Sequence, residues 1–80
     1  MKKIEVISID RIGLVGDISK LLSRVNCNII THTADVSSDG FTAISHFSAD
    51  VDINTDFDTE TLSRRLRKIK NVRQVRITDI

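Results

Sequence analysis

The chain has 80 residues, of which twelve are basic and eleven acidic, and its net charge is +1. This length allows one domain, which buries only roughly 60–65% of the surface that its unfolded chain exposes. The balance of charge excludes a global field that would by itself attract nucleic acid or an anionic membrane. A single cysteine excludes an internal disulfide and fits a reducing compartment. Because we find no signal peptide and no run of about 20 apolar residues, we expect a cytoplasmic protein without membrane contact.

The chain begins with an apolar strand that a turn joins to an amphipathic helix. Residues 4–9 read Ile-Glu-Val-Ile-Ser-Ile, which is typical of a strand. The helix is predicted by apolar side chains that recur on one face, at Leu14, Ile18, Leu21, Leu22 and Val25, and it should end near Asn26. The turn carries Gly13 and exposes the first backbone N–H groups of the helix, which can hold a carboxylate or phosphate. The junction therefore predicts a small site for an anion or an amino acid.

Two further strands and a hairpin turn follow. Residues 28–36 are rich in β-branched side chains, and Asp39-Gly40 is a dipeptide typical of hairpins. The third strand is predicted by apolar residues that alternate with polar ones, at Phe41, Ala43, Phe47, Ala49 and Val51. Ser45 is the exception on the buried face and Ile44 the exception on the outer face. An outward isoleucine in so small a domain indicates a contact with another chain.

The last part of the chain predicts a helix and a final strand. The cluster Asn54-Thr55-Asp56-Phe57-Asp58 is typical of a helix start, because acidic residues suit the positive end of the helix dipole. An apolar stripe continues the helix through Leu62, Leu66 and Ile69. The segment from Val72 to Ile80 then predicts a strand.

The resulting order is β-α-β-β-α-β, which indicates an α+β, ferredoxin-like fold. In this fold two helices cover one face of a four-stranded antiparallel sheet. If Phe41, Phe47 and Val51 point toward the helices, the open face is lined by Thr31, Thr33, Asp35, Thr42, Ile44, His46 and Ser48. Because that face and a sheet edge stay uncovered in a monomer, we expect a homodimer.

Two sequence features resemble the ACT domain, the small ligand-binding regulatory module of amino-acid metabolism enzymes. They are Asp10-Arg11-Ile12-Gly13-Leu14-Val15 before the first helix, and Asn28-Ile29 at the start of the second strand. The resemblance extends from Ile4 to Val75, and it is strongest to the C-terminal ACT domain of the GTP pyrophosphokinases, the bifunctional (p)ppGpp synthetase/hydrolases of the bacterial stringent response. It implies that residues 1–80 form a single ACT domain, a C-terminal module of a longer enzyme. The sequence differs at Ile12, where many ACT domains carry proline.

The resemblance also implies a ligand site between two protomers. The loop before the first helix of one protomer would meet the start of the second strand of the other. Asp10 and Asn28 would bind the amino and carboxyl groups of an amino acid, since an amide both donates and accepts hydrogen bonds. Backbone N–H groups and apolar walls would complete the site, whose implied ligand-binding residues are Asp10, Arg11, Ile12, Gly13, Leu14, Val15, Asn28 and Ile29. The alternative is that these residues serve only as a strand end, a cap and a turn.

The histidines and the cysteine are weaker candidates for a metal site or a catalytic site. His32 and His46 should point to opposite faces of the sheet as structural histidines, and Cys27 should be a small buried side chain. Without a CxxC or HxxxH spacing we expect no metal site and no cofactor. The sequence also has no nucleophile paired with a base and no phosphate loop. We therefore expect no catalytic residues in this chain, although the parent protein would be an enzyme.

The function expected is a ligand-sensing or dimerisation module that controls the catalytic domains of a GTP pyrophosphokinase. The first alternative is a free-standing ACT regulator of amino-acid metabolism. The second is a domain that contacts RNA or the ribosome, through a basic cluster at Arg64, Arg65, Arg67, Lys68, Lys70, Arg73 and Arg76. The plainer interpretation of that cluster is a solvated helix face. An acylphosphatase-like enzyme is disfavoured, because its phosphate-binding loop is missing.

Overall fold

The computed structural model describes residues 1–53 and 58–80, and its elements follow the predicted order. They are β1 (Lys2–Ile9), α1 (Leu14–Arg24), β2 (Asn28–Ser38), β3 (Ala43–Asp52), α2 (Thr59–Arg67) and β4 (Val72–Asp79). The predicted helix start at residues 54–57 lies outside the described residues. Asp58, the last residue of that cluster, is the N-cap of α2, and its carboxylate accepts a hydrogen bond from the Glu60 amide at 3.0 Å.

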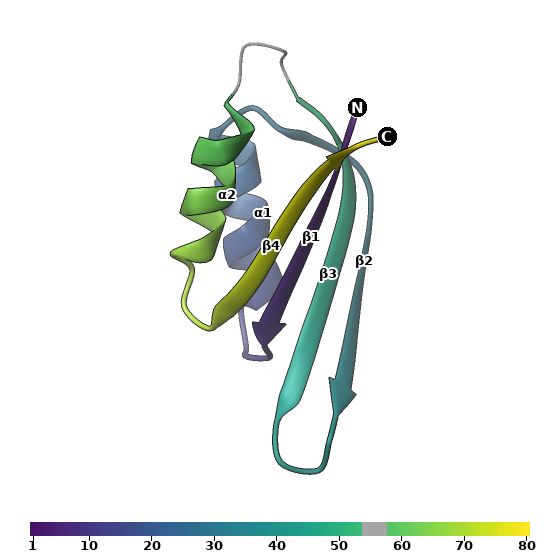
Figure 1. Ribbon diagram of the computed structural model, residues 1–80, viewed down its shortest axis with the longest axis vertical. Coiled ribbons are helices and arrows are strands. Elements are labelled where there is room, and N and C mark those ends of the chain that lie inside the picture. The colour runs from purple at the N-terminus through teal and green to yellow at the C-terminus, as the bar shows by residue number, and fades with distance from the viewer. Residues whose placement is uncertain (54–57) are drawn as a thin grey trace.

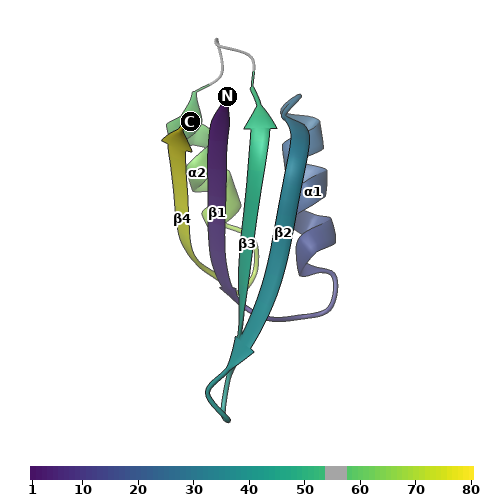
Figure 2. The same ribbon diagram turned by 90° about the vertical axis from the view of Figure 1, so that its right-hand side faces the viewer.

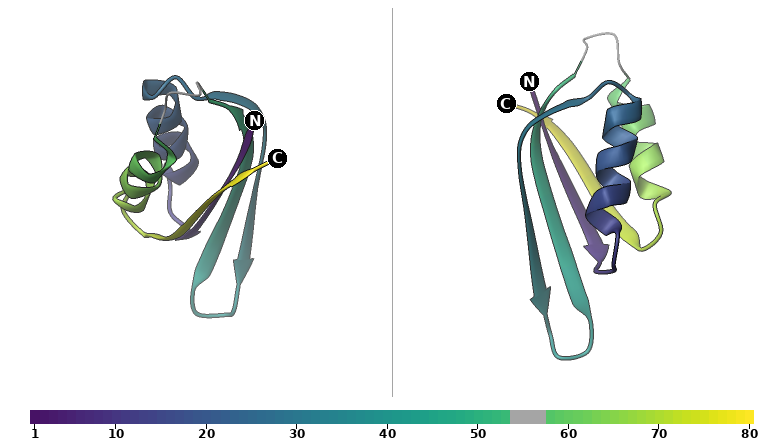
Figure 3. Two further views of the ribbon diagram at one scale, coloured as in Figure 1. Left: turned by 45° about the horizontal axis from the view of Figure 1, so that its top comes forward. Right: turned by 180° about the vertical axis from the view of Figure 1, so that it is seen from behind.

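The four strands form one antiparallel sheet in the order β2-β3-β1-β4. Both helices lie on the same face of the sheet, and the other face is open (Figure 1, Figure 2). The predicted ferredoxin-like fold is therefore confirmed. The hairpin of β2 and β3 extends beyond the helix layer, so its far end has no helix packed on either side (Figure 3).

The core lies between the sheet and the helices. The apolar stripe of α1 is buried at Leu14, Ile18 and Leu22, and α2 contributes Leu62 and Leu66. These side chains pack against the alternate residues of the two central strands, Ile4, Val6, Phe47, Ala49 and Val51. Each large aliphatic side chain buried in this way contributes roughly 1.5–3 kcal/mol. Packing of these stripes therefore fixes which face each element turns inward.

Strand pairing confirms most of the predicted open face. Thr31, Thr33 and Asp35 of β2 lie opposite Asp50, Ser48 and His46 of β3. On the same face His46 Nε2 is 3.7 Å from Glu5 Oε2 of β1. The other histidine, His32, lies on the opposite face and stacks on Phe47 with ring centroids 5.9 Å apart. The histidines thus point to opposite faces, as predicted.

The prediction that Phe41 points inward is wrong, because its side chain is 98% exposed. β3 begins only at Ala43, and Phe41 belongs to the hairpin turn. The backbone amides of Phe41 and Thr42 donate to Asp39 Oδ1 at 2.9 and 2.8 Å, and Gly40 has a φ of 93°. Thr42 consequently belongs to the turn as well, ahead of the strand face on which it was expected. The turn lies beyond the helices, where no second layer could bury an aromatic ring.

The two chain ends lie together at one end of the sheet (Figure 2). The Ile80 amide donates to the Met1 carbonyl at 3.3 Å, and the Lys2 ammonium forms an ion pair with the Asp79 carboxylate. Across the sheet, Ile29, Val51, Lys2 and Asp79 occupy one row. In the part of the chain that the structure describes, neither helix is long and apolar enough to cross a membrane.

Candidate functional site

The loop between β1 and α1 presents the amino end of α1. Its first residue, Asp10, is exposed, and the Asp10 amide donates to the Ala43 carbonyl at 2.9 Å. Gly13 is the N-cap of α1 with a φ of 83°, a left-handed conformation that glycine adopts without a steric penalty. A glycine has no side chain with which to cap the helix, and among the described residues no other side chain caps α1 by a hydrogen bond. The amino end of α1 thus has no side-chain cap, although Asp17 places a carboxylate in the first turn.

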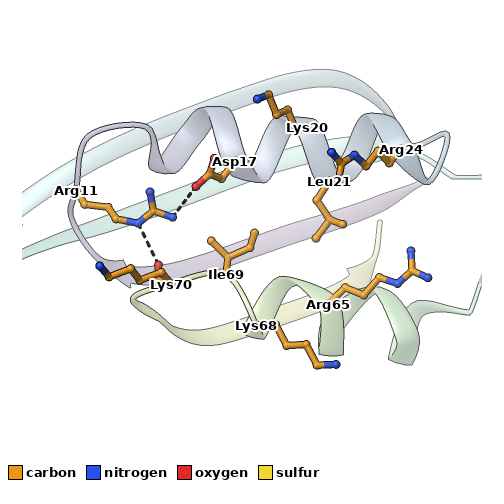
Figure 4. Close-up of a pocket in the computed structure, with 9 residues that line it drawn as sticks. All are labelled: Arg11, Asp17, Lys20, Leu21, Arg24, Arg65, Lys68, Ile69 and Lys70. Carbon is orange, nitrogen blue, oxygen red and sulfur yellow. Dashed lines mark hydrogen bonds and ion pairs between the residues drawn. The ribbon is translucent and has the colours of Figure 1, made fainter.

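Arg11 ties this loop to two other parts of the domain (Figure 4). Its Nη2 lies 2.6 Å from Asp17 Oδ2 in α1, and its Nε donates to the Lys70 carbonyl at 3.2 Å. The same guanidinium reaches the Ile12 carbonyl at 3.3 Å through Nη1. All three of its nitrogen atoms therefore donate within the chain, and Arg11 holds the loop in place.

The apolar residues of the predicted site differ sharply in exposure. The Ile12 side chain is fully exposed, and Val15 is half-buried. The Leu14 side chain is only 2% exposed and belongs to the core, so only its backbone can face a ligand. An apolar wall at this loop therefore depends on Ile12 and Val15.

The second half of the predicted site lies at the other end of α1. Asn28 is exposed at the first position of β2, and Ile29 is half-buried beside it. They line a shallow hollow of about 440 Å³ together with Ser19, Ser23, Asn26 and Cys27. Because α1 has eleven residues and rises about 1.5 Å per residue, its far end, beyond which Asn28 follows, lies roughly 17 Å along the helix from Gly13. One chain therefore does not bring Asn28 to the loop at Asp10, and a site that uses both needs a second protomer.

Cys27 is 5% exposed and is a small buried side chain, as predicted. Burial, followed by the negative charge of Asp52, raises the pKa of the Cys27 thiol to about 11. A thiol with this pKa is neutral near pH 7 and a poor nucleophile. The Cys27 side chain is therefore suited to packing in the core rather than to nucleophilic catalysis.

The basic cluster is divided among several surfaces. Arg65, Lys68 and Lys70 line the groove between the two helices, together with Arg11. Arg64 and Arg67 line a separate hollow with Glu60, and Arg76 lies on the open face of the sheet opposite Glu5. Lys70 lies beside the predicted ligand loop, because Arg11 Nε donates to its carbonyl. The turn after α2 brings Lys70 against Arg11, which the spacing of residues along α2 could not indicate.

A family model for the ACT domain matches residues 2–76. The chain belongs to the ACT domain family. ACT domains are regulatory ligand-binding modules. The exposed loop and the hollow at Asn28 therefore lie in a regulatory domain. The sequence has no significant match among curated proteins.

Solved structures share the fold of this ACT domain. The ACT domain from GTP pyrophosphokinase of Chlorobium tepidum superposes with a TM-score of 0.71 at 21% identity, over 95% of this chain and 94% of that one. An ACT domain protein from Streptococcus pneumoniae gives 0.77 at 20% identity, over 96% and 85% of the two chains. A formyltetrahydrofolate deformylase from Pseudomonas putida gives 0.82 at 14% identity, over 99% of this chain. The present chain spans only 28% of that deformylase, and similarities at this level of identity concern the fold alone.

Proposed function

We propose that this ACT domain is the regulatory module of a GTP pyrophosphokinase and binds a small amino acid between two protomers. The observation that carries the proposal is the uncapped amino end of α1 at Gly13, which lies close in sequence to the exposed carboxylate of Asp10. A zwitterion needs donors for its carboxylate and an acceptor for its ammonium group. The helix end supplies the donors, and Asp10 supplies the acceptor.

The partner protomer supplies the rest of the proposed site. Its Asn28 is exposed and offers both an N–H donor and a carbonyl acceptor. Ile12 of one protomer and Ile29 of the other provide apolar surface, which favours a branched apolar side chain on the ligand. The helix dipole contributes about 0.5–2 kcal/mol toward the ligand carboxylate, and an ion pair near the surface adds about 1 kcal/mol or less. These polar contributions total about 3 kcal/mol or less, and a millimolar dissociation constant corresponds to about 4 kcal/mol, so an affinity in the micromolar to millimolar range also requires the apolar contacts.

The exposed surface of β2 supports the pairing of two protomers. β2 is an edge strand, and the register of its ladder shifts between Ile29 and Thr31. The intervening Ile30 is 49% exposed, immediately beside Asn28 and Ile29. An exposed edge with a projecting apolar side chain favours contact with a second chain. We place the partner loop next to this part of β2.

An NMR titration with the common amino acids tests the ligand site. We expect shifts of the amides between Ile9 and Asp17 and of Asn28. Asn28→Ala should weaken binding by about 1–3 kcal/mol, because a ligand group loses its partner. Gln74→Ala is the matched control, since it removes an exposed amide from β4 on the open face. If no amide of the loop shifts, or if the two variants behave alike, the site is wrong.

A free-standing ACT regulator is the second candidate. It is favoured because this chain covers 85% of the length of the solved ACT domain protein from Streptococcus pneumoniae. The coding sequence upstream of Met1 separates the two. A continuous frame that encodes hydrolase and nucleotidyl-transferase regions supports the pyrophosphokinase. A stop codon directly upstream supports the free-standing regulator.

A further inference from the structure

The groove between α1 and α2 concentrates positive charge. Its cationic side chains come from both helices and from the segments that flank them, and they are Arg11, Lys20, Arg24, Arg65, Lys68 and Lys70. These are six of the twelve basic residues of the chain, whereas Asp17 is the one acidic residue that lines the groove among the residues that the structure describes. Like charges held this close repel one another and attract a multivalent anion.

Asp17, the one carboxylate among the described residues of the groove, is already paired. Asp17 binds Arg11, and among the described residues the other five cations take part in no salt bridge. The helices run antiparallel, and Arg65 extends from α2 toward the end of α1 that carries Arg24, whereas Lys20 and Lys68 lie at the outer edges of the groove (Figure 4). A bound anion can therefore be contacted from both sides.

The shape of the groove limits the size of that anion. Its volume is about 450 Å³, within the range of roughly 300–1,000 Å³ typical of small-molecule sites. The half-buried Leu21 and Ile69 form an apolar floor between the charged edges (Figure 4). At one end Arg11 crosses from Asp17 to the Lys70 carbonyl and closes the groove.

We infer that this groove binds a small molecule that carries two or more linked phosphate groups. RNA fits less well, because its backbone would have to continue past the end that Arg11 closes. The described residues that line the groove also include no aromatic side chain on which a base of single-stranded RNA could stack. The inference goes beyond the proposed amino-acid site and does not depend on it, since α2 has no part in that site.

Calorimetric titration at low salt with orthophosphate, tripolyphosphate, GTP and a short RNA duplex tests the inference. Tripolyphosphate and GTP should bind at least about tenfold more tightly than orthophosphate, because linked phosphates contact cations on both sides at once. Tighter binding of GTP than of tripolyphosphate would identify a nucleotide as the source of the phosphates. Equal binding would identify inorganic polyphosphate.

Two double variants of α2 provide matched evidence. Arg65→Gln with Lys68→Gln removes two charges from the groove, and Arg64→Gln with Arg67→Gln removes two charges from the neighbouring hollow. The groove variant should weaken tripolyphosphate binding about tenfold or more, and the control should change it less than about threefold. Equal weakening by both variants would show a diffuse surface field and overturn the site. Binding of the RNA duplex without binding of tripolyphosphate would overturn it as well.

Discussion

Arg11 Nη2 lies 2.6 Å from Asp17 Oδ2, so an arginine of the predicted ligand loop is paired with the first turn of the helix that follows it. Since the guanidinium also binds the Lys70 carbonyl, the loop, α1 and the segment before β4 are joined through one side chain. Asp17→Asn removes the charge of the pair while keeping the size of the side chain. Because the pair is partly exposed, the free energy of unfolding should fall by only about 0.2–1 kcal/mol. Amide exchange at residues 12–15 should nevertheless become faster, and unchanged exchange would contradict the role of Arg11 in the loop.

Gly13 and Gly16 should respond to alanine in opposite ways. A Cβ at Gly13 would meet only Arg11 Nη1 at 3.9 Å, but the φ of 83° is unfavourable for any L side chain. Gly13→Ala should therefore cost about 1–2 kcal/mol. Gly16 lies inside α1, with nothing within 4 Å of an added methyl group, so Gly16→Ala should stabilise by about 0.5–1 kcal/mol. Urea unfolding of the two variants measures both effects, and changes of the same sign would be inconsistent with a left-handed Gly13.

Cys27 should make the protein less stable at high pH. Its pKa is about 11 in the folded chain and about 8.5 in an unfolded one, so the folded state binds its proton more tightly. The stabilisation is complete below about pH 8.5 and is lost as the pH rises toward about 11. Melting temperatures measured across this window should fall more steeply for the wild type than for Cys27→Ala. Identical slopes would mean that the thiol titrates normally.

Asp58 should have the corresponding effect at acid pH. Hydrogen bonds from the Thr61 hydroxyl and then from the Glu60 amide lower the pKa of its carboxyl group. The folded state therefore binds this proton less tightly, and the stabilisation is lost as the pH falls below about 4 through the folded pKa. Asp58→Asn keeps a capping side chain without the charge. Its unfolding, followed by circular dichroism, should depend less on pH than that of the wild type between about pH 5 and about pH 2. An equal dependence in the two proteins would contradict a lowered pKa at Asp58.

Self-association provides the test of the proposed dimer. Light scattering at high micromolar concentration should detect dimers, and Ile30→Lys should weaken them about tenfold or more by placing a charge in the contact. Phe41→Ser is the control, because it removes an exposed apolar side chain from the far end of the hairpin. A wild-type chain that stays monomeric with its fold intact would rule out the pairing.

Sequence periodicity predicted the two helices and the two central strands well because each of them has one buried face. The stripes at Leu14, Ile18 and Leu22 and at Leu62 and Leu66 are the ones that the core buries. The same reasoning failed for Phe41, because alternation indicates a face of the sheet but not whether a helix covers it at that position. The groove was missed for a related reason. Lys20 and Arg24 join Arg65 and Lys68 only once the antiparallel packing of α1 and α2 is known.

The row of residues that holds Ile29 also holds Lys2 and Asp79, next to the two chain ends. In the proposed dimer, the loop of one protomer would therefore meet its partner at the end of the sheet where the partner's Met1 and Ile80 lie. A ligand held there would act on whatever is joined to the other subunit, rather than on its own. Control of this kind would operate in trans. It would be lost in a heterodimer in which one chain carries both the only intact loop and the only attached enzyme.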